Sequence, residues 1–296
     1  MIKNADKILF RCSALGSIMT EPQGKSNLQK YLEKKQQHQE LITKYEAIAN
    51  KGTKTASNLA VKILKYELQA KDLEKIKDDV LLSKTCMSNL VKVYIKDKYG
   101  REKDIHSRYM IKGLEVEEDS LTLYSRFTKQ YFTKNEETFK NEWIKGTPDI
   151  IVNPSKEAET DHLQTIIDIK SSWDIFTFFD TTISELKDGY YWQLQGYMAL
   201  TGASKARLVY CLCDTPDSIL NDEKRRLMWR MNVLSDNDPF FIDACEKLDK
   251  LHTYSDVDIE ERVHVIEFDR NDEDIERLYK RIEDCRKYMN KSFFNL

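Results

Sequence analysis

Short apolar segments rich in β-branched residues alternate with amphipathic ones, and this alternation limits the possible folds more than any other feature. β-Branched residues favour strands, and four such segments occur at 138–153, 162–172, 205–213 and 262–270. Apolar residues at helical spacing, which indicate helices packed on a core, fill 112–132, 184–202 and 272–291. Helices interleaved with strands in this way predict an α/β protein around one mixed sheet.

The first third of the chain has a different character. Residues 26–82 follow a helical pattern rich in Lys, Gln and Leu, with a break at 50–57. The run 90–111 alternates in a way that predicts a hairpin around Gly100, and PSKEAETD (154–161) predicts a loop. We therefore expect an N-terminal helix of the core at 1–24, a helical insertion or subdomain at 25–90, and the core with its C-terminal helix at 91–296.

Charge is divided unevenly along the 296 residues. Residues 1–100 carry 19 Lys or Arg against 11 Asp or Glu, whereas the remainder carries 28 against 39. This excess of positive charge in residues 1–100 has two possible explanations. The N-terminal part either faces an anionic partner or carries lysines that are only solvated. The Lys-rich segment 25–80 accordingly predicts either a DNA clamp or an oligomerisation or lid element.

Several classes of protein are excluded by composition. No run approaches the roughly 18–20 apolar residues that a membrane span requires, and the N-terminus does not match a secretory signal, so we expect a cytoplasmic protein. The six cysteines show no C-x-x-C pair and no zinc spacing with the five histidines. A structural zinc site or an iron–sulfur cluster held by cysteines is therefore not expected.

The charged residues at the ends of two predicted strands carry the chemistry. Asp149 follows Pro148 at the start of DIIV, and Asp168 and Lys170 close the run IIDIK. Side chains alternate along a strand, so Asp168 and Lys170 share one face and Ile169 lies on the other. Two converging carboxylates are costly unless a cation lies between them, and oxygen ligands suit Mg²⁺ or Mn²⁺. A lysine beside them can serve a metal-bound water or a phosphate, so the pattern predicts metal-assisted phosphodiester hydrolysis.

Pro-Asp followed about twenty residues later by Asp-x-Lys resembles the signature of the PD-(D/E)xK nucleases. Two further segments, KGLEVEED (112–119) and YYWQLQGYMALTG (190–202), are similar to helices of the phage lambda exonuclease group of viral recombination nucleases. FRCSALGSIMT (10–20) is weakly similar to that group's opening helix. The match covers about 105–213 and the first twenty residues. It departs from the group in one respect, because Asp168 stands where Glu is commoner.

This resemblance implies a restriction-endonuclease-like core and specific roles. Asp149, Asp168 and the carbonyl of Ile169 would hold Mg²⁺ or Mn²⁺, and Glu117 would complete the site. Glu118 is the alternative if the helix is rotated. Lys170 would serve the attacking water, and Gln193 would position water or a phosphate oxygen. Contacts to DNA would come from Ser13, Arg11 and Tyr190, whereas Gln195 points elsewhere on its helix and is expected to cap a neighbouring loop or strand.

The expected function is a Mg²⁺-dependent DNA exonuclease that acts on duplex DNA with a free end. The resemblance also implies phage-type recombination, a single-strand annealing recombinase as a partner, and a homo-oligomer. Two alternatives are a structure-specific or restriction-type endonuclease with the same site, and a catalytically silent DNA-binding module. Intact Asp149, Asp168 and Lys170 argue against the silent module.

Overall fold

The computed structural model describes residues 4–49, 53–103, 107–153, 164–184 and 188–294. The predicted loop at 154–161 lies outside these residues. The chain forms two compact units, one made of residues 1–8, 17–100 and 280–296 and the other of residues 9–16 and 101–279. We call the second one the sheet unit. Among the described helices, none combines the length and the apolar character that crossing a lipid bilayer requires.

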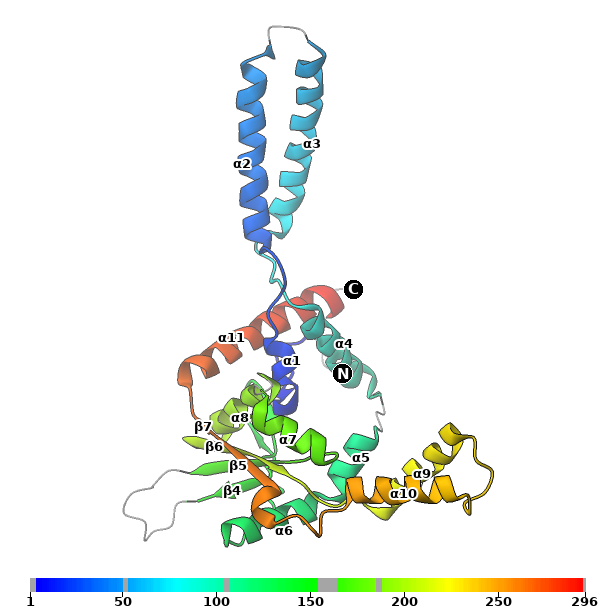
Figure 1. The fold of residues 1–296 in the computed structure, drawn as a ribbon. Coiled ribbons are helices and arrows are strands. Elements are labelled where there is room, and N and C mark those ends of the chain that lie inside the picture. Colours follow the sequence, from blue (N-terminus) through cyan, green and yellow to red (C-terminus); the bar gives the residue numbers. More distant parts are fainter. Residues whose placement is uncertain (1–3, 50–52, 104–106, 154–163, 185–187, 295–296) are drawn as a thin grey trace. The chain divides into compact units, whose positions relative to one another are not determined.

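A mixed four-stranded sheet forms the centre of the sheet unit (Figure 1). Its strands run in the order β4 (Ile150–Val152), β5 (Thr165–Ser171), β6 (Lys205–Cys211) and β7 (Val263–Asp269). β5 and β6 are parallel, whereas β4 and β7 are antiparallel to their neighbours. The predicted mixed central sheet flanked by helices is therefore confirmed.

A second, smaller sheet divides the segment that the sequence predicts as one strand. β3 (Ile144–Gly146) pairs parallel with β1 (Phe10–Arg11) and antiparallel with β2 (Phe139–Lys140). Asn141 makes the turn between β2 and β3, because its Oδ1 accepts hydrogen bonds from the backbone N–H groups of Trp143 and Ile144, both at 2.9 Å. The chain then leaves this sheet and enters β4 just after Asp149.

Helices cover both faces of the central sheet. α6 (Glu117–Thr128) packs on one face, where a buried apolar cluster consists of Val116, Leu123, Tyr124, Phe132, Ile150, Ile167, Val209, Cys211, Cys213 and Val263. α8 (Asp188–Thr201) lies on the opposite face and ends at Gly202, whose φ of +77° allows the turn into β6. The remaining helices of the unit are η1 (Cys12–Ala14), α5 (Arg108–Glu115), α7 (Ile175–Ile183), α9 (Asp217–Met231), α10 (Pro239–His252) and η3 (Ile259–Glu261).

The other unit contains the predicted helical insertion. α2 (Asn27–Glu46) and α3 (Lys54–Ile76) pack against each other, and Tyr31 on α2 donates a hydrogen bond to Glu74 on α3 at 3.1 Å. Helix α4 (Lys84–Tyr99) and the short η4 (Asn290–Phe294) also belong to this unit. Two helices, α1 (Leu15–Met19) and α11 (Asp272–Met289), contain residues of both units. The domain boundaries drawn from the sequence stay a prediction.

The hairpin predicted around Gly100 is wrong. Residues 84–99 form the helix α4, and Gly100 ends it with φ of +63°. Ser83 accepts a hydrogen bond from Cys86 N and so caps the first turn, while Cys86 and Leu90 are buried one turn apart. The two caps and this buried pair favour the helix over the alternation of Val91, Val93 and Ile95.

Candidate active site

The face of β5 toward α8 carries Asp168 and Lys170, as the alternation predicts. Asp168 is 2% exposed, and Lys170 Nζ lies 2.6 Å from its Oδ2. From α8, Gln193 Nε2 donates a hydrogen bond to Asp168 Oδ1 at 3.0 Å and another to the Tyr197 hydroxyl at 3.0 Å. The structure thus joins three residues that the sequence selected from two separate motifs.

Asp149 meets this group through the register of the sheet. Ile150 lies opposite Ile167 in the antiparallel pairing of β4 and β5, so the next position places Asp149 opposite Asp168. Asp149 Oδ2 accepts a hydrogen bond from Ile169 N at 2.7 Å. The two aspartates, nineteen positions apart in the sequence, therefore meet at the end of one strand pair.

Both aspartates hold their protons more tightly than free carboxyl groups. Burial, and then the negative charge of Asp168, raise the pKa of Asp149 to about 7. Burial also raises the pKa of Asp168, although the ammonium of Lys170 opposes the shift. For Lys170, burial is the largest influence and lowers the pKa, but the ion pair and hydrogen bond with Asp168, together with attraction to Asp149 and Tyr190, outweigh it in sum, so the pKa is raised. Lys170 is therefore protonated at neutral pH, and the positive charge it supplies does not offset the burial of both carboxylates.

Glu117 lies at the first position of α6 and faces the same cleft as Asp149. Its charge contributes to the raised pKa of Asp149, and its Oε2 accepts a hydrogen bond from Lys134 Nζ at 2.7 Å. Glu118 lines the same cleft, whereas Glu115 accepts a hydrogen bond from Ser218 at 2.9 Å. The helix places both predicted candidates, Glu117 and Glu118, at the cleft.

The oxygen donors fit a divalent cation. Asp168 Oδ2 is buried, and the ammonium of Lys170 lies 2.6 Å from it in an ion pair. Adjacent buried carboxyl groups whose pKa stays raised despite this ammonium are an arrangement that a hard cation relieves. Within the described ranges, however, no three His, Cys, Asp or Glu side chains come together as a metal cluster. The oxygen donors available for a cation are those of Asp149, Asp168 and the carbonyl of Ile169. Glu117 lines the same cleft but accepts a hydrogen bond from Lys134.

Tyr190 forms part of the cleft wall beside Lys170. The ammonium of Lys170 lies 5.5 Å from the centroid of the Tyr190 ring, and that ring meets Tyr210 edge to face at 6.2 Å. Gln195, two positions after Gln193 and therefore on another side of α8, donates to the carbonyl of Asp269 at 2.9 Å and accepts from Asn271 N at 2.9 Å. The prediction that Gln195 supports neighbouring backbone is confirmed.

Arg11 and Ser13 lie elsewhere in the sheet unit. The side chains that line the cleft in the described part of the chain do not include them. Arg11 is exposed and lies 3.8 Å from Glu102, and Ser13 is exposed in η1. Cys12 between them is buried against α8, where a Cβ added to Gly196 would lie 3.1 Å from its Sγ. Their predicted contact with DNA stays a prediction.

The cleft itself has a volume of about 1180 Å³ and contains all the acids of the site except the buried Asp168. Arg126, Lys129 and Lys134 lie along it on the side of α6 and the segment that follows. Tyr109 and Leu114 of α5 line it as well and are 53% and 71% exposed. The cleft thus brings Lys and Arg side chains together with the carboxylates of Asp149 and Glu117.

Asn135 positions Asp149 and was not found from the sequence. Its backbone N–H donates to the carbonyl of Asp149 at 2.7 Å, and its Nδ2 donates to the carbonyl of Pro148 at 2.9 Å. Nothing in the local pattern marks this residue, because its partners are backbone groups of a distant loop. Asn135 nevertheless helps to hold the loop that carries the Pro-Asp pair, through both its backbone N–H and its side chain.

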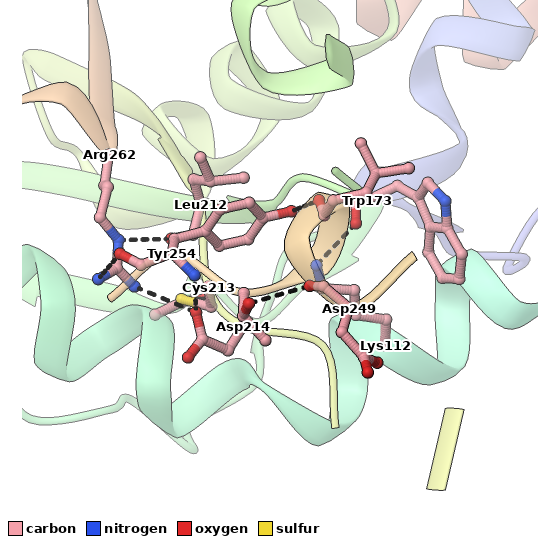
Figure 2. A network of polar contacts seen from close by, with 11 residues as sticks. Lys112, Trp173, Leu212, Cys213, Asp214, Asp249, Tyr254 and Arg262 are labelled. Carbon is pink, nitrogen blue, oxygen red and sulfur yellow. Dashed lines mark hydrogen bonds and ion pairs between the residues drawn. The ribbon is translucent and has the colours of Figure 1, made fainter. Parts of the chain in front are cut away.

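Lys112 is a second residue that sequence reasoning missed. It is 1% exposed, and its Nζ donates to the carbonyl of Trp173, just beyond β5, at 2.7 Å (Figure 2). The same network continues through Tyr254 N, which donates to Asp214 at 2.8 Å, and through Arg262 Nε, which donates to the carbonyl of Leu212 at 3.0 Å. Lys112 precedes the buried Val116 by four positions, so helical spacing could have marked it as facing inward. It ties α5, which leads into Glu117, to the strand of Asp168 and Lys170.

Comparisons with known proteins place the fold. No family model matches the sequence, and no curated protein matches it. A phage-related exonuclease from Haemophilus somnus 129PT superposes with a TM-score of 0.59 and 23% identity, over 96% of this chain and 95% of that chain. This likeness shows that the two chains share a fold.

Two further solved structures are similar to this chain over a smaller part. Both are of LHK-Exo, an alkaline exonuclease from Laribacter hongkongensis, and one of them is a complex with dAMP. Each covers 71% of this chain and 85% of its own, at a TM-score of 0.45 and identities of 13% and 14%.

Proposed function

We propose that this chain is a metal-dependent DNA exonuclease that hydrolyses phosphodiester bonds of linear duplex DNA. The observation that carries the proposal is the register of β4 and β5, which sets Asp149 opposite Asp168 with Lys170 in an ion pair beside them. The fold shared with a phage-related exonuclease adds support. Motif order alone would fit a chance arrangement, whereas buried convergence of these groups at a cleft is what the chemistry requires.

Each residue has a role in this proposal. Asp149, Asp168, the Ile169 carbonyl and Glu117 would hold Mg²⁺ or Mn²⁺, which when bound lowers the pKa of water and offsets charge on the phosphate. Lys170 keeps its proton at neutral pH because its pKa is raised, so it donates to the attacking water or to a phosphate oxygen. Gln193 keeps Asp168 oriented through the hydrogen bond to Oδ1.

The cleft also suits a polyanionic substrate. Arg126 and Lys129 lie on its rim, where they can neutralise phosphates of the DNA backbone. Tyr190 offers an aromatic face next to Lys170. We extend the proposal to phage-type recombination in a host cytoplasm, with a single-strand annealing recombinase as partner and with several copies of this chain in one assembly. These extensions rest on the resemblance of the motifs.

The test is degradation of an end-labelled linear duplex beside a covalently closed circle, with Mg²⁺ or with EDTA. Wild type is compared with Lys170→Ala, which removes the ammonium beside Asp168, and with Lys205→Ala, which removes an exposed lysine at the start of β6. We expect the wild type and Lys205→Ala to degrade only the linear DNA and only with Mg²⁺. Removal of one preorganised donor that stabilises transition-state charge commonly costs a factor of about 10² to 10³ in rate, so Lys170→Ala should show almost no cleavage.

Other outcomes would contradict specific parts of the proposal. If the closed circle is nicked or linearised, the protein is an endonuclease that uses the same residues, and the exonuclease proposal is wrong. Cleavage that persists in EDTA would contradict the proposed dependence on a metal ion. A wild type that cleaves neither substrate with Mg²⁺ or Mn²⁺ would favour a silent DNA-binding module.

A further inference from the structure

The exposed face of α9 carries arginines around an uncovered tryptophan. Arg225, Arg226, Trp229 and Arg230 belong to α9, and Arg108 joins them from the start of α5. We call these five residues the α9 patch. Together with Glu223 they line a hollow of about 570 Å³ in the sheet unit, on a helix that lies beside α10 (Figure 1).

Part of the α9 patch is organised by a buried acid. The side chain of Glu223 is 8% exposed, and it accepts hydrogen bonds from Arg108 Nη1 at 2.6 Å and from Arg226 Nη1 at 3.3 Å. One carboxylate holds two guanidinium groups, which leaves excess positive charge and fixes both groups in place. Fixed guanidinium groups lose little side-chain entropy when they bind an anion.

The charge of the α9 patch remains positive after its ion pairs are counted. Arg225 pairs with Asp222, while Arg230 is exposed and forms no ion pair with the residues that the structure describes. Four arginines therefore face two acids. Residues 101–296 carry 28 Lys or Arg against 39 Asp or Glu, so this surface is positive in an acidic part of the chain. Such a local reversal suits an anionic partner.

Trp229 indicates which kind of anion fits. Its side chain is 87% exposed, although burying an indole is strongly favourable. An exposed aromatic ring between arginines is the combination that stacks on unpaired bases while the arginines contact the phosphates. Bases in a duplex keep their faces covered by one another, so a single strand is the form that can use this ring.

The first turn of α5 links the α9 patch to the candidate active site. The guanidinium carbon of Arg108 lies 5.2 Å from the ring centroids of both Tyr109 and Trp173. Tyr109 lines the cleft that contains Asp149 and Lys170. A strand that runs from the cleft over Tyr109 would therefore reach Arg108 and then the arginines of α9.

We infer that the α9 patch binds a single-stranded segment of the nucleic acid whose other part lies in the cleft. The assignment of nucleic acid as the partner rests on the proposed function, but the binding needs no cleavage. It can therefore be measured in EDTA, where the proposed chemistry does not run.

The experiment measures the affinity of a fluorescein-labelled oligothymidylate by anisotropy over a range of salt concentrations in EDTA. Three variants are compared with wild type, namely Trp229→Ala, Arg230→Gln and the control Lys247→Gln. Lys247 is a 75% exposed lysine on α10, outside the patch. We expect Trp229→Ala to weaken binding about 10-fold, because one stacked base is lost. Arg230→Gln should lower the slope of log affinity against log salt by about 0.7, the value for one phosphate contact on a single strand.

Two results would overturn the inference. In the first, Trp229→Ala and Arg230→Gln bind oligothymidylate as tightly as Lys247→Gln does. The α9 patch would then not bind a single strand, and a protein partner would be favoured. An equal loss on a blunt-ended duplex and on the oligothymidylate would show that Trp229 does not select a single strand. Cleavage of the end-labelled duplex by wild type is measured in parallel with Mg²⁺. Patch-dependent binding without any cleavage would refute the proposed nuclease and support this inference, whereas cleavage without patch-dependent binding would do the reverse.

Discussion

Lys112 offers a quantitative test of how the sheet unit is held together, through the change Lys112→Met. Burial is the main reason that the pKa of Lys112 is lowered from 10.5 to about 8, and nearby Cys213 and Asp174 oppose the shift. The amine keeps one acceptor, the carbonyl of Trp173 at 2.7 Å, and lies within 6 Å of the ring centroids of Trp173 and Tyr254, at 5.9 and 5.8 Å. Folding therefore buries a charge that is only partly compensated.

The sign of the pH dependence follows from this lowered pKa. Between pH 8 and pH 10.5 the unfolded chain binds more protons at this lysine than the folded chain, so the free energy of unfolding rises with pH. Below pH 8 both states are protonated and the full penalty is present. A lowering from 10.5 to about 8 corresponds to about 3 kcal/mol at roughly 1.4 kcal/mol per unit.

Methionine at position 112 removes this titration and leaves the Trp173 carbonyl without its donor. That loss costs about 1–3 kcal/mol at every pH, so it does not alter the slope. We expect wild type to gain about 3 kcal/mol relative to Lys112→Met as the pH rises from 7 to 10.5. The difference between the two proteins is the useful quantity, since all other titrating groups cancel in it.

Urea unfolding followed by tryptophan fluorescence measures this difference in the right part of the molecule. All four tryptophans, at positions 143, 173, 192 and 229, belong to the sheet unit. Lys205→Met, at an exposed position, is the matched control and should parallel wild type. If the curves of wild type and Lys112→Met run parallel from pH 7 to 10.5, Lys112 does not carry a buried charge and the reasoning is wrong.

Two further predictions concern the site and the packing beneath α8. Asp149→Asn should stabilise the metal-free protein at pH 8 by about 1–2 kcal/mol, because it removes one of two adjacent buried charges while keeping an acceptor for Ile169 N. Thermal unfolding in EDTA checks this, and a melting temperature of Asp149→Asn at or below that of wild type would contradict it. The same measurement with Mg²⁺ tests the proposed metal ligand, because an equal rise of melting temperature in both proteins would contradict metal binding by Asp149. Gly16→Ala should destabilise by about 1–3 kcal/mol, since its Cβ would lie 2.3 Å from Gly189 Cα. Gly113→Ala is the control, because a Cβ there meets nothing within 4 Å, and it should be neutral or stabilising by up to about 1 kcal/mol in urea unfolding. An equal decrease in the free energy of unfolding of Gly16→Ala and Gly113→Ala would refute the packing argument.

Local sequence patterns sufficed for most of the regular elements of the sheet unit. β5, β6 and β7 follow apolar, β-branched runs, and α8 ends at Gly202 as the glycine predicts. These features depend on neighbours within a few positions, so a linear pattern contains them. The same reasoning failed at 90–111, where alternation and helical spacing coexist and the caps at Ser83 and Gly100 decide between them.

Only part of the candidate site could be predicted from the sequence. Alternation along one strand placed Asp168 and Lys170 on a common face, and helical spacing separated Gln193 from Gln195. The meeting of Asp149 with Asp168 depends on the register of two strands, which is a property of the sheet and not of either segment.

The distant backbone partners of Asn135 and Lys112 were beyond sequence reasoning, although helical spacing could mark Lys112 as facing inward. Asn135 holds the loop of Asp149, and Lys112 holds the exit of β5, through carbonyls that only the fold brings near. The α9 patch likewise depends on Arg108 reaching Glu223 across 115 positions of sequence. The sequence itself therefore specifies the chemistry and the strand that bears it, while long-range pairing and burial decide which groups meet, because those contacts form between segments that are remote along the chain.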